Sequence, residues 1–125
     1  MLFRSPYESD GARSVVDFGI SGLPYSTLGS GFLSGKYQEG QSVDSMRAQG
    51  VTNNYANPEN FGLLKRLTLV AEKMNVSNTA LALAWLRMRQ GVTVPLASGR
   101  TIEQLHALMQ KVDLSPEDAG FIAGK

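Results

Sequence analysis

The sequence contains no cysteine, which excludes disulfides, thiolate metal sites and cysteine nucleophiles. His106 is the single histidine, so no cluster of imidazoles replaces the missing thiols, and we predict no metal site. An excess of one charge is lacking as well, because 12 Lys and Arg face 11 Asp and Glu, for a net charge of +1. Nucleic acid is therefore not expected as a partner, since binding to phosphates favours a strongly basic chain.

Long hydrophobic runs are also absent. The longest apolar run, residues 80–86, is far shorter than the roughly 20 residues of a membrane-spanning helix. Residues 1–8 contain no apolar stretch long enough for a signal peptide. Hydrophobic residues make up 42% of the chain, enough for a packed core. We expect a soluble cytoplasmic protein with no membrane partner.

The second half of the chain carries strong helix signals. Asn57 followed by Pro58 is typical of a helix start, and apolar residues at three- and four-residue spacing continue the pattern to Asn75. Residues 78–90 are apolar on nearly all sides, which predicts a buried helix with Trp85 in the core.

Two shorter helices are expected beyond that point. Thr101 with Gln104 three residues later forms a capping-box pattern, and Ile102, Leu105, Leu108 and Met109 predict a core-facing side. Ser115 before a proline predicts a last helix that ends near Gly124.

Two short segments are predicted to be strands, at residues 20–25 and 92–96, and a weak helix at 8–18 precedes the first. Residues 26–57 lack periodicity, which predicts a long loop that covers a ligand. Strands separated by helices favour parallel pairing and an α/β class. Because two parallel strands are not a self-sufficient sheet, the chain is expected to be part of a larger one.

Two loops are candidates for binding an anion. Residues 29–36 are rich in glycine, but they match neither the dinucleotide fingerprint nor the Walker pattern, so a flexible turn is the alternative. Ser98, Gly99 and Arg100 link a predicted strand to a predicted helix start, where backbone N–H groups and a guanidinium attract phosphate. The alternative there is a solvated Arg100 beside the helix cap Thr101.

Two aromatic side chains are ambiguous from the sequence. Tyr25, at the end of the first predicted strand, is either a residue at the edge of the core or a platform for a flat ring. His106 is interpreted as a surface residue, because no serine or carboxylate has a recognisable relation to it.

Several stretches, in order along the chain, resemble aldo-keto reductases. Residues 23–37 resemble the segment after barrel strand seven in that family, with the sequence LPYSTLGSGFLSGKY. Residues 81–86 and 94–105 resemble the helix before strand eight and the strand with its phosphate loop, with the sequences LALAWL and VPLASGRTIEQL. Residues 114–118 are similar to the closing helix and residues 2–4 to the end of the strand-six loop.

The resemblance implies a partial, roughly half-length TIM-type (β/α)8 barrel over residues 1–125, with about two βα units and a C-terminal helix. It also implies NADP(H) as cofactor and the reduction of aldehydes and ketones. Tyr25 would stack on the nicotinamide, and Ser26, Leu28, Gly29 and Ser30 would line the pyrophosphate path. Ser98, Gly99 and Arg100 would surround the 2′-phosphate, and Gln104 would face the adenine.

Some elements of the family pattern are missing. Ala107 and Leu108 stand where the family commonly has a Glu-Asn pair at the adenine, and Thr27 replaces a frequent proline. The family's catalytic Asp, Tyr, Lys and His have no counterpart here, so the resemblance implies no catalytic residue in this chain. We therefore expect an inactive oxidoreductase piece that binds NADPH. The alternative is a non-catalytic half-barrel module that self-associates through exposed strand edges or complements another half-barrel.

Overall fold

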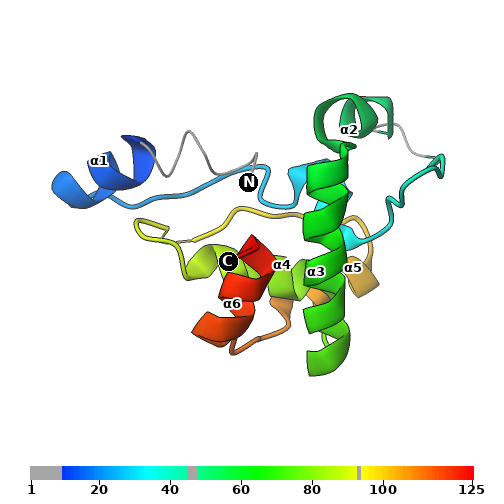
Figure 1. The fold of residues 1–125 in the computed structure, drawn as a ribbon. Coiled ribbons are helices and arrows are strands. Elements are labelled where there is room, and N and C mark those ends of the chain that lie inside the picture. Colours follow the sequence, from blue (N-terminus) through cyan, green and yellow to red (C-terminus); the bar gives the residue numbers. More distant parts are fainter. Residues whose placement is uncertain (1–9, 45–47, 93) are drawn as a thin grey trace.

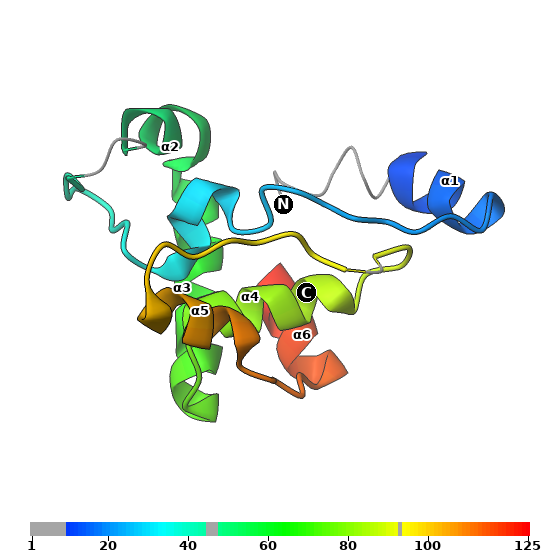
Figure 2. The ribbon, with the colours of Figure 1, turned by 180° about the vertical axis from the view of Figure 1, so that it is seen from behind.

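The structure, a computed structural model, describes residues 10–44, 48–92 and 94–125. Helices dominate this part of the chain, as Figures 1 and 2 show. The helical elements are α1 (Ala12–Asp17), the 3₁₀ helix η2 (Gly29–Ser34), α2 (Ala48–Tyr55), α3 (Pro58–Met74), α4 (Asn78–Arg87), α5 (Ile102–Met109) and α6 (Pro116–Ala123). Residues 2–4, the expected helix start at Glu8, and Thr93 lie outside the described residues.

Helix α3 begins and ends where its sequence predicts. The Asn57 side chain accepts a hydrogen bond from the Asn60 backbone N–H at 2.9 Å, and Pro58 occupies the first turn. Asn75 ends the helix in a left-handed conformation with φ 53°. One side of α3 is buried in the core, through Leu63, Leu64, Leu67, Val70 and Ala71.

Helix α4 is buried as its composition predicts. It is capped by Ser77 and contacts α3, α5 and η2. Trp85 donates from its indole nitrogen to the Ala119 carbonyl of α6 at 3.0 Å, which confirms that this tryptophan belongs to the core. The helix ends at Arg87, three residues before the predicted end at residue 90.

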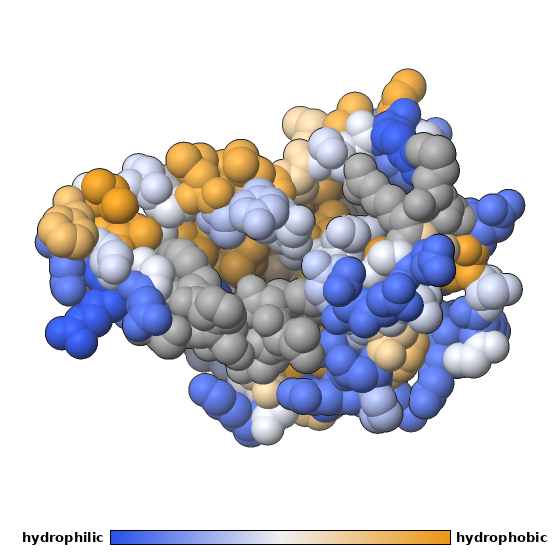
Figure 3. All heavy atoms as spheres, turned by 90° about the horizontal axis from the view of Figure 1, so that it is seen from above, coloured by the Kyte–Doolittle hydropathy of each residue, from blue (hydrophilic) through white to orange (hydrophobic). Residues whose placement is uncertain are grey.

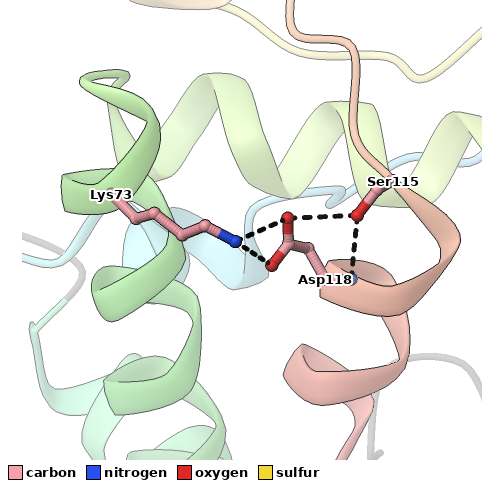
Figure 4. Close-up of polar contacts among 3 residues, drawn as sticks. All are labelled: Lys73, Ser115 and Asp118. Atoms are coloured by element: carbon pink, nitrogen blue, oxygen red, sulfur yellow. Dashed lines mark hydrogen bonds and ion pairs between the residues drawn. The ribbon is translucent and has the colours of Figure 1, made fainter.

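Helix α6 is joined to α3 by polar contacts at both of its ends. Ser115 caps its start, and Lys73 contacts the Asp118 carboxylate at 2.9 Å (Figure 4). At the other end, the Arg66 side chain donates from Nε to the Ile122 carbonyl at 3.1 Å. Gly124 follows in the left-handed region with φ 77°, as predicted for the helix end.

The predicted loop over residues 26–57 is wrong in part, because η2 and α2 lie within it. Phe32 of η2 is fully buried, and its ring lies 6.2 Å from Tyr37, 6.3 Å from Tyr55 and 5.5 Å from Phe61. Positive φ occurs at three residues of η2, Gly29, Ser30 and Gly31, and again at its C-cap Gly35, so the segment has no regular helical period. Burial of one aromatic ring therefore organises a stretch that periodicity could not identify.

The prediction of an α/β half-barrel with βα units is also wrong, since the described residues form no sheet. Residues 20–25 and 94–98 are extended and lie side by side, but among the described residues they form no strand ladder. One isolated parallel bridge joins Gly22 to Val92, just before the second segment, and the Val94 N–H donates to the Gly22 carbonyl at 3.3 Å. Leu96 N–H donates to the Pro24 carbonyl at 2.9 Å. In a parallel ladder, a residue whose carbonyl accepts a hydrogen bond from the neighbouring strand also donates its own backbone N–H to that strand. Pro24 has no backbone N–H, so the second hydrogen bond cannot form and the ladder is interrupted.

The predicted core face of α5 is wrong for three of its four residues. Ile102, Leu105 and Met109 are exposed, and only Leu108 is partly buried. Helix α5 contacts α4, and its partly buried residues are Ala107 and Leu108. The described part of the chain supplies no apolar surface that covers Ile102, Leu105 and Met109.

The Phe32 cluster generates a test of the core. Phe32→Ala should reduce the free energy of unfolding by about 3–5 kcal/mol, because it removes the ring that joins η2, α2 and α3. Urea unfolding followed by far-ultraviolet circular dichroism measures the change. The control, Leu69→Ala, truncates a half-exposed side chain on α3 and should cost less than about 1 kcal/mol. Equal losses would contradict the placement of Phe32.

The contact between Lys73 and Asp118 generates a pH dependence. The Lys73 ammonium and the Ser115 hydroxyl lower the pKa of the Asp118 carboxyl, and Asp118 in turn raises the pKa of Lys73. A carboxyl with a lowered folded-state pKa stabilises the fold above its ordinary pKa of about 3.9, and this stabilisation is lost as pH falls through the lowered value.

We therefore expect Asp118→Asn to lower the Tm at neutral pH and to flatten the fall of Tm in acid. Scanning calorimetry from neutral to acidic pH measures both effects. Asp17→Asn is the control, because Asp17 forms an exposed pair with Arg13 at 3.5 Å and should leave the acid limb unchanged. An unaltered acid limb in Asp118→Asn would refute the assigned role.

Candidate functional site

The first candidate loop, residues 25–30, has an unusual backbone. Ser26 and Ser30 have φ of 52° and 55°, in the left-handed region that non-glycine residues rarely adopt, and Gly29 has φ 56°. The Gly29 N–H donates to the Ser26 carbonyl at 2.9 Å and closes a turn. At Ser26 and Ser30 such a conformation costs on the order of 1–3 kcal/mol each, and strain of this kind clusters where a protein holds a ligand.

Tyr25 precedes this turn and is 82% exposed. Of the two interpretations of Tyr25 from the sequence, an edge of the core and a platform for a ring, the exposure excludes burial in the core of the described residues. Leu28 is half-buried against the core cluster, and Gly29 is buried. The loop therefore has one side on the core and one aromatic side chain in solvent.

The second candidate loop, residues 98–101, lies beside the first because of two hydrogen bonds. The Leu96 N–H donates to the Pro24 carbonyl, and the Thr27 hydroxyl donates to the Leu96 carbonyl, each at 2.9 Å. Thr27 thus connects segments that are 69 residues apart in the chain. No local pattern in the sequence signals this role, and the family resemblance marks Thr27 only as a replacement for proline.

The start of α5 confirms the capping residue and corrects the capping box. The Thr101 hydroxyl accepts from the Gln104 N–H at 3.2 Å, as predicted. The Gln104 side chain, however, accepts from the Arg100 N–H at 2.8 Å instead of from the cap residue. An anion at this helix start must therefore compete with the amide oxygen of Gln104 for the N–H of Arg100.

Charges of both signs lie at this helix start. Ser98 and Arg100 are exposed, and Glu103 lies in the first turn of α5. The Glu103 backbone N–H and the Thr101 hydroxyl lower the pKa of the Glu103 carboxyl, so it stays ionised at neutral pH. The helix start therefore offers the Arg100 guanidinium to an anion, whereas the N–H groups of Arg100, Glu103 and Gln104 are already hydrogen-bonded within the chain and one carboxylate lies close in sequence.

Gly99 lies tightly against the same helix. A Cβ at Gly99 would stand 3.0 Å from the Gln104 Cβ and 3.1 Å from the Leu105 nitrogen. Since one of these neighbours is backbone, a larger residue would push the loop away from α5. Glycine at this position therefore allows the loop to approach the helix start closely.

Beyond the two loops, the described residues offer few groups that could bind a ligand or a metal ion. His106 is exposed, as its surface interpretation predicts, and lines a shallow hollow with Ser77, Met109 and Gln110. No group of three or more His, Asp or Glu within residues 10–44, 48–92 and 94–125 is arranged to hold a metal ion. In the same residues, no helix has both the length and the apolar character to cross a membrane.

The packing at Gly99 generates a prediction. Gly99→Ala should lower stability by about 1–3 kcal/mol, because the added methyl overpacks the contact with Gln104 and Leu105. Thermal unfolding measures the change. Gly120→Ala is the control, since a methyl group at Gly120 would meet nothing within 4 Å and alanine favours the helix. The result would count against close packing if both variants were neutral.

Curated proteins of similar sequence show what this chain is related to. The chain is 28% identical over 101 residues to L-glyceraldehyde 3-phosphate reductase of Escherichia coli O157:H7, covering 76% of this chain and 29% of that protein. It is 27% identical over 123 residues to an Arabidopsis thaliana protein named "Probable voltage-gated potassium channel subunit beta", covering 93% of this chain and 37% of that protein. The chain thus spans roughly a third of the length of these curated relatives.

The family model described as "Aldo/keto reductase family" matches residues 5–124, which include both candidate loops and the whole helical core. A match of this extent is sufficient to assign the family. The chain therefore belongs to the aldo/keto reductase family.

Proposed function

We propose that this chain carries the NADP(H)-binding surface of an oxidoreductase that reduces aldehydes and ketones to alcohols. Family membership supports the class of reaction. The relative named L-glyceraldehyde 3-phosphate reductase acts, by its name, on a small phosphorylated aldehyde, which supports a small carbonyl compound as substrate. The single observation that carries the proposal is the hydrogen-bonded approach of the two loops through Pro24, Thr27 and Leu96.

The donor set of the two loops fits a dinucleotide phosphate. In this proposal, Arg100 binds the 2′-phosphate together with Ser98 and the closely packed Gly99, and Gln104 lies toward the adenine. The turn that contains Ser26, Leu28, Gly29 and Ser30 lines the pyrophosphate path. Its left-handed backbone at Ser26 and Ser30 supports this role, because strained conformations of this kind cluster where a protein holds a ligand.

In the same proposal, Tyr25 binds the nicotinamide end of the cofactor. Its exposed ring is available to stack on a flat heterocycle and to keep water from one of its faces. When bound, the cofactor supplies the hydride that reduces a carbonyl carbon. The chain offers no counterpart of the family's proton donor, so we propose that it binds cofactor and that turnover by this chain alone is negligible.

The assignment of Arg100 leads to a binding test. Arg100→Ala should weaken NADPH binding about 10- to 100-fold, the loss expected for one charge-assisted contact. Binding of NADH, which lacks the 2′-phosphate, should change little. Isothermal titration calorimetry with both dinucleotides measures the two effects.

Arg87→Ala is the matched control, because Arg87 is an exposed arginine at the end of α4, outside both loops. This control should bind both dinucleotides like the wild type. Equal losses for NADPH and NADH in Arg100→Ala would refute the role of Arg100. No binding of either dinucleotide by the wild type would refute the proposed function itself.

An assembly module is the second candidate function, and exposed apolar side chains favour it. Large hydrophobic side chains on α1 and on the extended segments at residues 20–25 and 94–98 are exposed to solvent (Figure 3). The Arabidopsis relative is, by its name, a channel subunit and thus a member of an assembly. In this candidate the chain acts by association with another polypeptide.

A further inference from the structure

The hydroxyl of Thr27 joins the two candidate loops at a point where the backbone does not. In a complete parallel ladder, the Leu96 N–H would donate to Pro24, and the Leu96 carbonyl would accept from the backbone N–H of Ser26. The first of these bonds is present at 2.9 Å. Ser26, however, has φ 52°, so the extended conformation of a ladder ends there. The Thr27 hydroxyl donates to the Leu96 carbonyl instead, at 2.9 Å.

Each loop is held in its own shape by contacts that do not involve the Thr27 side chain. In the first loop, the Gly29 N–H donates to the Ser26 carbonyl and closes the turn. In the second, the Gln104 side chain accepts from the Arg100 N–H at 2.8 Å. The Thr27 bond therefore fixes the position of one loop relative to the other and leaves the internal shape of each loop to local contacts.

The residue type suits this task. Threonine is branched at Cβ, so its side chain has few rotamers and its hydroxyl stays aimed in one direction. Thr27 is partly buried, which restricts the side chain further. The bond itself is exposed to solvent, so water competes for the Leu96 carbonyl, and its effect should be that of one hydrogen bond of ordinary net strength.

A dinucleotide is a ligand for which the spacing of the two loops matters. In the proposed function, the first loop lines the pyrophosphate path and Arg100 binds the 2′-phosphate, so a single molecule has to reach both. When two sites bind one molecule, the second contact forms readily only if the sites are held at the right separation. Looser spacing lowers the affinity for the whole molecule and leaves the affinity for each part unchanged.

We propose that Thr27 is a positioning residue for the cofactor, whose hydroxyl holds the two loops at the spacing that a dinucleotide phosphate spans. This role rests on the proposed function and adds to it the side chain that makes two separate loops act as one site. Thr27 acts through Leu96 on the second loop, and no contact between Thr27 and the cofactor is required.

Thr27→Val tests this role, because valine keeps the branched shape of threonine and removes the hydroxyl. NADPH binding should weaken about 3- to 10-fold, the loss expected for one hydrogen bond. Binding of adenosine 2′-monophosphate, which carries the adenine and the 2′-phosphate without a pyrophosphate, should change less than about 2-fold. Isothermal titration calorimetry with both ligands measures the two effects.

Two control variants make the result specific. Thr27→Ser keeps a hydroxyl and should bind NADPH more tightly than Thr27→Val. Thr52→Val is the matched control, because Thr52 is an exposed threonine on α2, outside both loops, and this variant should bind both ligands like the wild type. Circular dichroism confirms that each variant keeps its helices.

A double variant tests whether Thr27 acts through the second loop. The spacing of the loops matters only while the second loop holds its phosphate, so Thr27→Val should weaken NADPH binding less when Arg100→Ala is already present. Amide hydrogen exchange, measured without any cofactor, tests the bond itself. The Leu96 N–H should exchange faster in Thr27→Val than in Thr27→Ser, because the segment that it joins to Pro24 is held less firmly.

Four results would overturn the positioning role. They are NADPH affinity unchanged in Thr27→Val, equal losses for NADPH and adenosine 2′-monophosphate, no difference between the serine and valine variants, and fully additive effects of Thr27→Val and Arg100→Ala. A wild-type protein that binds NADPH as tightly as Thr27→Val does refutes this role alone. A wild-type protein that binds neither NADPH nor NADH refutes the proposed function and, with it, the cofactor role of Thr27.

Discussion

The burial of α4 by its neighbouring helices is the constraint on which the rest of this structure depends. A helix that is apolar on nearly all sides is stable in water only when neighbours cover all of it, so α3, α5, α6 and η2 are arranged around α4. Each neighbour then presents its remaining groups outward. The two candidate loops occur at these outward positions: one leads into η2 and the other leads into α5.

Features that depend on neighbouring residues could be predicted from the sequence. Asn57, Ser115 and Thr101 cap their helices as their patterns predict, because a cap is a contact between residues three apart. The sheet could not be predicted correctly, because a strand depends on a partner distant in the chain, and Pro24 cannot complete the ladder. The same reason explains η2, whose organisation depends on Phe32 meeting aromatic rings from α2 and α3.

The candidate site also has one part that the sequence could predict and one part that it could not. The two loops could be identified from residue types and from the family resemblance, but the contacts that position them could not. Thr27 reaches a carbonyl 69 residues away, and Gln104 turns back to Arg100 instead of to the cap residue. Hydroxyl and amide side chains have many partners available, and the tertiary fold decides among them.

The indole of Trp85 has a practical consequence. It is the single tryptophan of the chain, it is buried, and its N–H is held by the first turn of α6. Its fluorescence emission therefore depends on whether α6 is seated, because separation would expose the ring to water and free its N–H. Arg89 stacks over the same ring at 4.2 Å, which adds a cationic neighbour to the fluorophore. The protein thus contains a native optical reporter for the docking of its last helix.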